Sequence, residues 1–95
     1  QAFDLAAGFV YSQILFACVK LRLFEFLNAG PRSVIEIARS AGLPEESADR
    51  LVKAAISLGL LERRKGGLVG LGAHGAAFLG NPGAMAMVEH HELLY

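Results

Sequence analysis

The sequence has 95 residues, of which 54% are hydrophobic, and its nine basic residues balance its nine acidic ones. This length allows one domain with a real core but not two. Zero net charge argues against a strong non-specific hold on nucleic acid. The single cysteine, Cys18, excludes an internal disulfide and fits a reducing compartment, so we expect a cytoplasmic protein.

The first predicted element is a helix over residues 3–27, which is apolar on nearly all sides. A helix of this kind must be covered on all sides, and one small domain covers only part of it. We therefore expect a homodimer in which this helix packs against the same helix of a second subunit. The residues predicted to form the dimer interface are Phe3, Leu5, Val10, Ile14, Leu15 and Phe16.

The same apolar run raises the question of a membrane span. The run from Leu5 to Val19 is interrupted by Gly8, Ser12 and Gln13. A span needs roughly 20 apolar residues, so we expect none here. Cys18 lies within the run, and we interpret it as a small buried hydrophobe rather than a reactive thiol.

After a stop at Asn28-Ala-Gly-Pro31, the sequence predicts a helix-turn-helix. Ser33 and Glu36 form a capping-box pattern, in which the Ser33 hydroxyl accepts a hydrogen bond from the Glu36 amide and the Glu36 carboxylate returns one. This pattern predicts a short helix to about Ser40, closed by Gly42.

The second helix of this pair is predicted over residues 45–58. Pro44 suits a first helical position, and Glu45 and Glu46 place negative charge at the positive end of the helix dipole. Gly59 ends the helix. One buried stripe at i, i+3, i+4 and i+7 is predicted from Leu51, Ala54, Ala55 and Leu58.

Residues 60–71 read as two short strands around a Lys65-Gly66-Gly67 turn, which predicts a β-hairpin. A short helix over Ala73–Leu79, a break at residues 80–83 and another helix from Ala84 follow. This order predicts a mainly α fold, a winged helix-turn-helix with an extra N-terminal dimerisation helix and a small β-hairpin wing. We expect one such domain over residues 1–95.

The stretch Gly70-Leu-Gly-Ala-His-Gly75 matches the nucleotide-binding pattern G-x-G-x-x-G. That pattern indicates a nucleotide site only where a parallel strand precedes it and a full helix follows it. Here the preceding strand is the return arm of a hairpin, and the following helix has about two turns. We therefore interpret the stretch as a loop and expect no cofactor in these residues.

Winged helices often bind DNA, so a DNA-binding transcriptional regulator is the alternative function. The wing favours it, since Arg63, Arg64 and Lys65 outweigh Glu62. The candidate recognition helix disfavours it, because its first turn is acidic at residues 45–46 and would repel phosphate. We expect no nucleic acid as partner.

The segment Glu89-His-His-Glu92 raises the question of a metal site. Adjacent histidines on a helix point about 100° apart, and the zinc pattern H-E-x-x-H has a tyrosine at its last position, so we expect no metal. The wall of a small-molecule pocket and an ordinary core or surface helix both remain open for this segment. No serine or cysteine has a paired histidine at a readable spacing, and we expect no catalytic residue.

Several groups of residues together resemble one known family. The first and last groups are the more specific, and the middle ones are shared by many winged helices. The groups are Gly8-Phe-Val-Tyr-Ser-Gln13, Leu21-Arg-Leu-Phe24, Gly30-Pro31, Glu36-Ile-Ala38, Gly42-Leu-Pro44, Arg50-Leu51, Ala54-Ala55, Leu58-Gly-Leu-Leu-Glu62, Gly80-Asn-Pro-Gly83 and His90-His-Glu-Leu-Leu-Tyr95. The chain resembles the N-terminal dimerisation domain of small-molecule O-methyltransferases that use S-adenosylmethionine, in particular the bacterial carotenoid enzymes of the hydroxyneurosporene O-methyltransferase type.

The resemblance implies a domain that pairs two subunits and helps to form the acceptor pocket. It implies that the cofactor S-adenosylmethionine and the catalytic histidine belong to a further domain. Because the chain starts without methionine and stops inside a helical pattern, we expect it to be a piece of a longer protein. By the resemblance, the substrate-binding residues are Phe9, Tyr11, Ser12, Gln13, His90, His91 and Tyr95. A pairing domain attached to an unrelated catalytic partner remains open.

Overall fold

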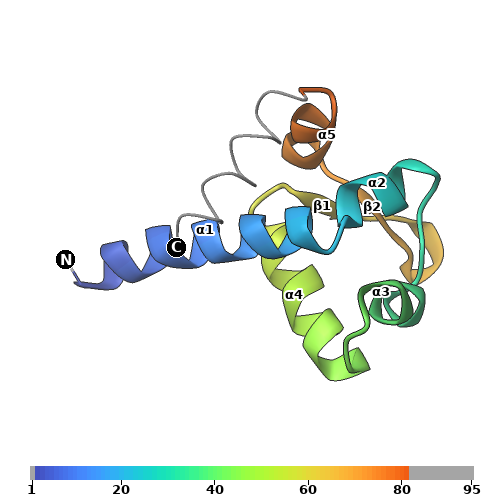
Figure 1. The fold of residues 1–95 in the computed structure, drawn as a ribbon, viewed down its shortest axis with the longest axis horizontal. Coiled ribbons are helices and arrows are strands. Elements are labelled where there is room, and N and C mark those ends of the chain that lie inside the picture. The colour runs from blue at the N-terminus through green and yellow to red at the C-terminus, as the bar shows by residue number, and fades with distance from the viewer. Residues whose placement is uncertain (1, 82–95) are drawn as a thin grey trace.

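The computed structural model describes residues 2–81, with side chains described from Tyr11 onward. Figure 1 shows a helical protein with a small hairpin on one side. In chain order the elements are α1 (Ala2–Lys20), α2 (Leu23–Asn28), α3 (Val34–Ala41), α4 (Glu45–Ser57), β1 (Leu61–Arg63), a 3₁₀ turn (Lys65–Gly67), β2 (Val69–Leu71) and α5 (Ala73–Leu79). The predicted fold class, a mainly α winged helix-turn-helix with a small wing, is confirmed.

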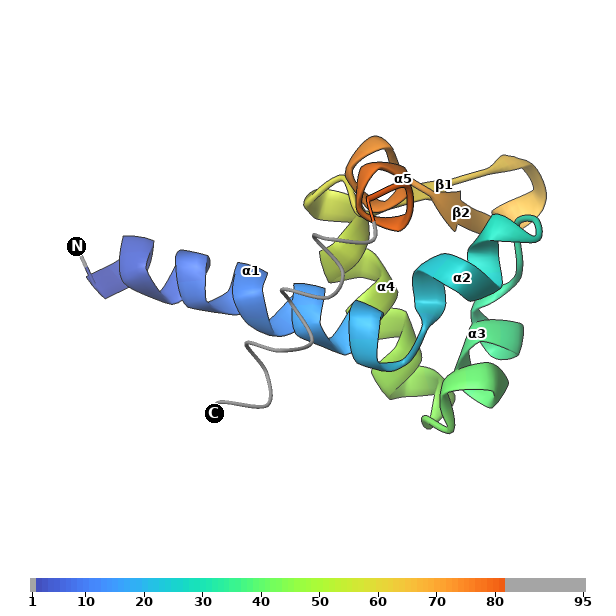
Figure 2. The same cartoon turned by 45° about the horizontal axis from the view of Figure 1, so that its top comes forward.

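The core lies around α2, which contacts the end of α1, α3, β2 and α5, and it also contains side chains of α4 and β1 (Figure 2). Phe24 is its largest fully buried side chain, and its ring stacks on that of Phe78 from α5 with the centroids 6.4 Å apart. Cys18 is also fully buried. Burial raises the pKa of the Cys18 thiol to about 12, so the group stays protonated and packs as a small hydrophobe.

The prediction of one continuous helix over residues 3–27 is wrong. The chain turns at Leu21 and Arg22 between α1 and α2, and Arg22 has a left-handed backbone with φ 58° and ψ 36°. The turn lets residues on both of its sides, Cys18 and Phe24 among them, enter the same core. Tertiary packing therefore overrides a local sequence that contains no helix breaker.

The capping box at the start of α3 is confirmed. The Glu36 amide donates to the Ser33 hydroxyl at 3.2 Å, and the Ser33 amide donates to the Glu36 carboxylate at 3.0 Å. At the other end, Gly42 closes the helix in the left-handed conformation with φ 71°. Pro44 is the N-cap of α4 rather than its first residue, since the helix begins at Glu45.

The predicted buried stripe of α4 is wrong for most of its members. The buried residues are Ala48, Val52 and Ala55, while the other predicted members, Leu51, Ala54 and Leu58, are only half-buried. Small side chains at positions 48 and 55 let the α4 backbone come close to its neighbours, and the larger leucines fill the flanks. Only Ala55 belongs to both sets.

The hairpin pairs Leu61 with Leu71 and Arg63 with Val69 in antiparallel register. A further bridge, which the sequence did not predict, joins Arg32 to Val69. The Arg32 amide donates to the Val69 carbonyl at 2.9 Å, and the Val69 amide returns a bond of 2.7 Å. The segment before α3 thus adds a third, one-residue strand to the wing and fixes the wing to the body.

Substitution of Ser33 by alanine is expected to lower the free energy of unfolding by about 1 kcal/mol, because the α3 N-terminus loses its cap. The contribution of the Glu36 carboxylate should depend on pH. The hydrogen bond from the Ser33 backbone amide, followed by the other Ser33 bond and by Arg32, holds the pKa of Glu36 below its usual range. A lowered folded-state pKa stabilises the fold above the unfolded-state pKa, and this stabilisation is lost as the pH falls.

Urea unfolding at pH 7 and at pH 3 checks both parts of this prediction. Ser33→Ala gives the cost of losing the hydroxyl cap, but it keeps the backbone amide that bonds the Glu36 carboxylate. The pH-dependent part is therefore read from Glu36→Gln, whose loss of stability relative to wild type should be smaller at pH 3 than at pH 7. A Glu36→Gln loss that is equal at the two pH values contradicts the charged capping box.

Candidate functional site

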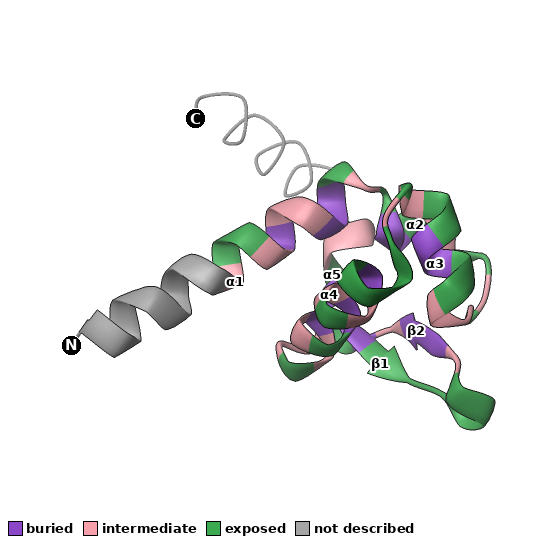
Figure 3. Ribbon diagram, turned by 90° about the horizontal axis from the view of Figure 1, so that it is seen from below, coloured by how far each residue is buried: buried purple, intermediate pink, exposed green. Residues whose placement is uncertain are grey.

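Helix α1 is divided into two parts by its surroundings. Its C-terminal part packs on α2 and α4, and Figures 1 and 2 show its N-terminal part extending well beyond α2–α5. Among the described positions of α1, which begin at Tyr11, Figure 3 shows the buried ones toward the end that joins the body. The sequence of the N-terminal part, residues 2–10, is almost entirely apolar.

The predicted interface and substrate residues within the described part of α1 differ in their surroundings. Leu15 is 8% exposed and belongs to the core of its own chain, which leaves it little surface for a partner. Tyr11 and Ile14 are half-buried and pack against this core, and Phe16 is half-buried. Ser12 and Gln13 are exposed. The helix therefore presents a polar strip at residues 12–13 beside half-buried apolar groups.

For the other predicted interface and substrate residues, the structure describes the backbone alone or nothing. Phe3, Leu5, Phe9 and Val10 lie on α1, but their side chains fall outside the described part of the structure. The predicted substrate residues His90, His91 and Tyr95 lie outside the described residues altogether, as does the helix predicted from Ala84.

Within residues 2–81 the structure brings together no group of three or more side chains that could hold a metal ion. The Nδ1 atom of His74 lies 3.0 Å from the Leu58 carbonyl oxygen, at the end of α4. No helix of the described chain is long and apolar enough to cross a membrane.

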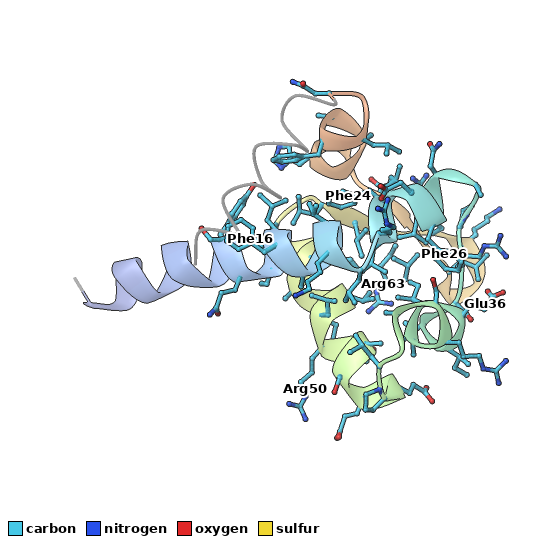
Figure 4. The ribbon with its side chains drawn as sticks, viewed as in Figure 1. Phe16, Phe24, Phe26, Glu36, Arg50 and Arg63 are labelled. Atoms are coloured by element: carbon cyan, nitrogen blue, oxygen red, sulfur yellow. The ribbon has the colours of Figure 1, made fainter. Side chains whose placement is uncertain are left out.

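The cations expected for DNA binding are mostly engaged within the fold. On α4, Arg50 lies 3.6 Å from Glu46, and Lys53 lies 3.1 Å from Asp49. In Figure 4 the Arg50 side chain points away from the body, on the outer side of α4. The α4 surface is thus a self-paired, solvated face whose first turn is acidic.

One cation of the wing, Arg64, also has partners within the fold. Arg64 donates to the Leu71 carbonyl oxygen at 2.7 Å and lies 3.4 Å from Glu62. Its side chain lies across the hairpin but is still 42% exposed, and Arg63 and Lys65 are exposed as well. Three cations beside Glu62, one of them bonded to the Leu71 carbonyl oxygen, make a weak footprint for a phosphate backbone.

A profile of known families matches residues 3–81, and its description is the O-methyltransferase dimerisation domain. The chain belongs to this family. This assignment confirms the resemblance seen in the sequence, and nothing in the comparisons supports the DNA-binding alternative.

Relatives of the domain agree with the assignment. The chain is 44% identical over its whole length to the demethylspheroidene O-methyltransferase of Cereibacter sphaeroides, and covers 25% of that protein. Among solved structures, an S-adenosylmethionine-dependent methyltransferase (SibL, apo form) matches with a TM-score of 0.80 and 33% identity, over 95% of this chain and 27% of the other. Human N-acetylserotonin methyltransferase bound to S-adenosylmethionine matches with a TM-score of 0.66 and 30% identity, over 80% and 25% of the two chains. The domain thus spans about a quarter of the length of these relatives.

The glycines of the stretch at residues 70–75 have a structural explanation in this dimerisation domain. A Cβ atom on Gly72 would overlap the backbone of Gly59, and one on Gly75 would overlap the Leu60 carbonyl oxygen. A Cβ on Gly70 would lie 2.6 Å from the Arg64 Nε atom. The interpretation of this stretch as a loop is wrong, because Gly70 and Leu71 end β2, residues 73–75 begin α5, and only Gly72 lies between them. The three glycines let α5 and the Arg64 side chain approach the hairpin closely.

Sequence reasoning missed the part played by Arg32 at the centre of this fold. Besides its backbone bridge to Val69, its guanidinium lies 5.3 Å from the centre of the Phe26 ring and 3.6 Å from Glu36. Figure 4 shows Phe26 and Glu36 on neighbouring elements, α2 and α3. Arg32 therefore ties α2 and α3 together through its side chain and joins β2 through its backbone. The i, i+4 spacing to Glu36 was the available signal, whereas the ring contact depends on the tertiary fold.

Proposed function

We propose that the chain is the N-terminal dimerisation domain, residues 1–95, of an S-adenosylmethionine-dependent O-methyltransferase that acts on a small hydroxylated molecule. The domain pairs two subunits through α1 and contributes to the acceptor pocket, and it has no catalytic activity alone. Methyl transfer and the cofactor belong to a further domain of the full-length protein.

The observation that carries this proposal is the match of residues 3–81 to the O-methyltransferase dimerisation domain. The solved relatives named above are methyltransferases described with S-adenosylmethionine. Because the domain covers about a quarter of each, the remaining three quarters of such proteins have room for a cofactor domain.

The pairing is proposed to use the N-terminal part of α1, because an apolar helix that extends beyond its own domain favours burial against a second copy. The interface would include Phe3, Leu5 and Val10, with Ile14 and Phe16 at its border with the body. Ser12 and Gln13 are the exposed polar groups of the same helix. Together with Phe9, Tyr11 and the C-terminal residues His90, His91 and Tyr95, they are proposed to line the acceptor pocket.

For the acceptor we propose a hydroxylated carotenoid, and for the location the cytoplasm. The carotenoid is supported by the resemblance of the sequence to carotenoid O-methyltransferases and by the 44% identity to a demethylspheroidene O-methyltransferase. Half-buried apolar side chains beside two polar groups on α1 suit an acceptor that is oily except at one hydroxyl.

The test uses the full-length protein with S-adenosylmethionine that carries an isotopically labelled methyl group. Labelled methyl ether should appear on a hydroxylated carotenoid, and not on the same carotenoid lacking the hydroxyl. Transfer to another hydroxylated acceptor with none to the carotenoid would reject the acceptor but keep the class of reaction. Absence of transfer to every hydroxylated acceptor, with cofactor bound, would reject the function.

A further inference from the structure

The turn between α1 and α2 has an unusual backbone. Among residues 2–81, Arg22 is the only residue other than glycine with a positive φ, at 58°. A left-handed backbone brings the Cβ atom too close to the following carbonyl oxygen, so a residue with a Cβ adopts it only where the surroundings require it.

The local sequence gives no reason for a turn at this point. Lys20-Leu-Arg-Leu-Phe24 contains no glycine, proline, asparagine or aspartate. Lysine, leucine and arginine are strong helix formers, so the segment by itself favours a continuous helix over residues 2–28. Local preference and tertiary structure disagree here, which is typical of functional or strained positions.

The core imposes the turn. Cys18 and Val19 before it, and Leu23 and Phe24 after it, are all at most 2% exposed within one cluster. In a straight helix Val19 and Leu23 would still share a face. Cys18 and Phe24, however, would point about 120° apart, so the turn is what lets all four residues enter one cluster. The Arg22 side chain does not explain the geometry, since it is 74% exposed and only pairs with Glu25 at 3.5 Å.

The turn also decides where α1 goes. In Figures 1 and 2 the N-terminal part of α1 leaves the body in a direction fixed by its angle to α2. We propose that Arg22 is a hinge whose left-handed conformation aims α1 at the partner subunit, in competition with a straight helix over residues 2–28. This inference rests on the proposed dimerisation through α1.

The first test asks whether residue 22 is left-handed in solution, with Arg50 as the matched control. Arg50 is equally exposed, at 76%, and pairs with Glu46 at 3.6 Å, but it lies inside the regular helix α4. Glycine is neutral toward the left-handed region, whereas valine is strongly disfavoured there. At position 22 the melting temperature should therefore follow the order Gly, then Arg and Ala, then Val. At position 50 glycine should be the lowest, about 4–8 °C below alanine. A glycine variant that is the least stable at position 22 as well overturns the proposal.

The second test measures the direction of α1. Spin labels on Ser12→Cys in α1 and Ser40→Cys in α3 occupy exposed positions, while Cys18 is fully buried and out of reach of the reagent. With labelled subunits diluted into unlabelled protein, Arg22→Gly should give one intramolecular distance. Arg22→Val should add a second, longer distance. Identical distance distributions in both variants overturn the hinge.

Sedimentation of the unlabelled variants links the hinge to dimerisation. We expect the dissociation constant of the dimer to rise about fivefold in Arg22→Val, as for a cost of about 1 kcal/mol, and to stay the same or fall in Arg22→Gly. Equal constants in both variants overturn the proposed link. A wild-type protein that is monomeric at micromolar concentration contradicts the proposed function instead, and the label distances then still decide whether the hinge exists.

Discussion

The double variant Phe3→Arg, Val10→Arg is expected to stay folded but to lose dimerisation. The two positions are seven residues apart, so they share one face of α1 two turns apart, and both are predicted interface residues. Burying a phenylalanine or valine side chain contributes about 1.5–3 kcal/mol, and each 1.4 kcal/mol is a factor of ten in a dissociation constant. We expect the dissociation constant to rise at least about 100-fold, measured by analytical ultracentrifugation over a concentration series.

The control is Ser40→Arg, at an exposed position in the last turn of α3, where a basic side chain suits the helix dipole. This variant should dimerise like the wild type. Circular dichroism should show the same helix content for all three proteins, because the N-terminal part of α1 extends beyond α2–α5 (Figures 1 and 2). If the double variant dimerises normally, α1 does not form the interface.

Much of the fold could be predicted because its signals are local. Ser33, Glu36 and Gly42 specify the ends of α3 through bonds and backbone angles that depend on only a few neighbouring residues. The hairpin is similar, because Gly66 and Gly67 adopt φ values of 73° and 76° that the turn requires. Helix α5 was predicted with its observed ends, because a glycine stands directly before it and another directly after it, at positions 72 and 80.

The features that were missed depend on contacts between distant parts of the chain. The turn at Arg22 arises because residues on both sides of it enter one core. No residue in the turn is of a type that predicts a turn from the sequence. The buried face of α4 was predicted from its leucines, but close approach to neighbouring elements selects Ala48 and Ala55 instead. Size and hydrophobicity alone do not reveal which face comes closest.

The candidate site was predictable in its location rather than in its detail. An apolar helix too large for a 95-residue domain to cover pointed to α1. The same reasoning placed Leu15 in the interface, although the domain's own core buries it. Periodicity gives the faces of a helix but does not say which face its own domain occupies.

Substitution of Gly75 by alanine is expected to destabilise the domain, although alanine is the better helix former. Gly75 lies inside α5, and a Cβ there would overlap the Leu60 carbonyl oxygen and lie 3.2 Å from the Phe24 ring. Leu60 and Phe24 are both fully buried, so α5 itself must move, and the stacking of Phe78 on Phe24 loosens with it. Such overpacking costs about 1–3 kcal/mol, more than the gain of about 1 kcal/mol in helix propensity. We expect the free energy of unfolding to fall by up to about 2 kcal/mol in urea.

The matched control is Gly80→Ala at the end of the same helix. Gly80 has an ordinary φ of −78°, and its added Cβ would lie 3.4 Å from the nearest atom, the Ala76 carbonyl oxygen. This variant should unfold within about 0.5 kcal/mol of the wild type. A Gly75→Ala variant as stable as the Gly80→Ala variant would mean that α5 does not pack closely on Leu60. The close packing would then no longer explain the glycines at positions 70–75, and the question of a phosphate-binding loop in this stretch would be open again.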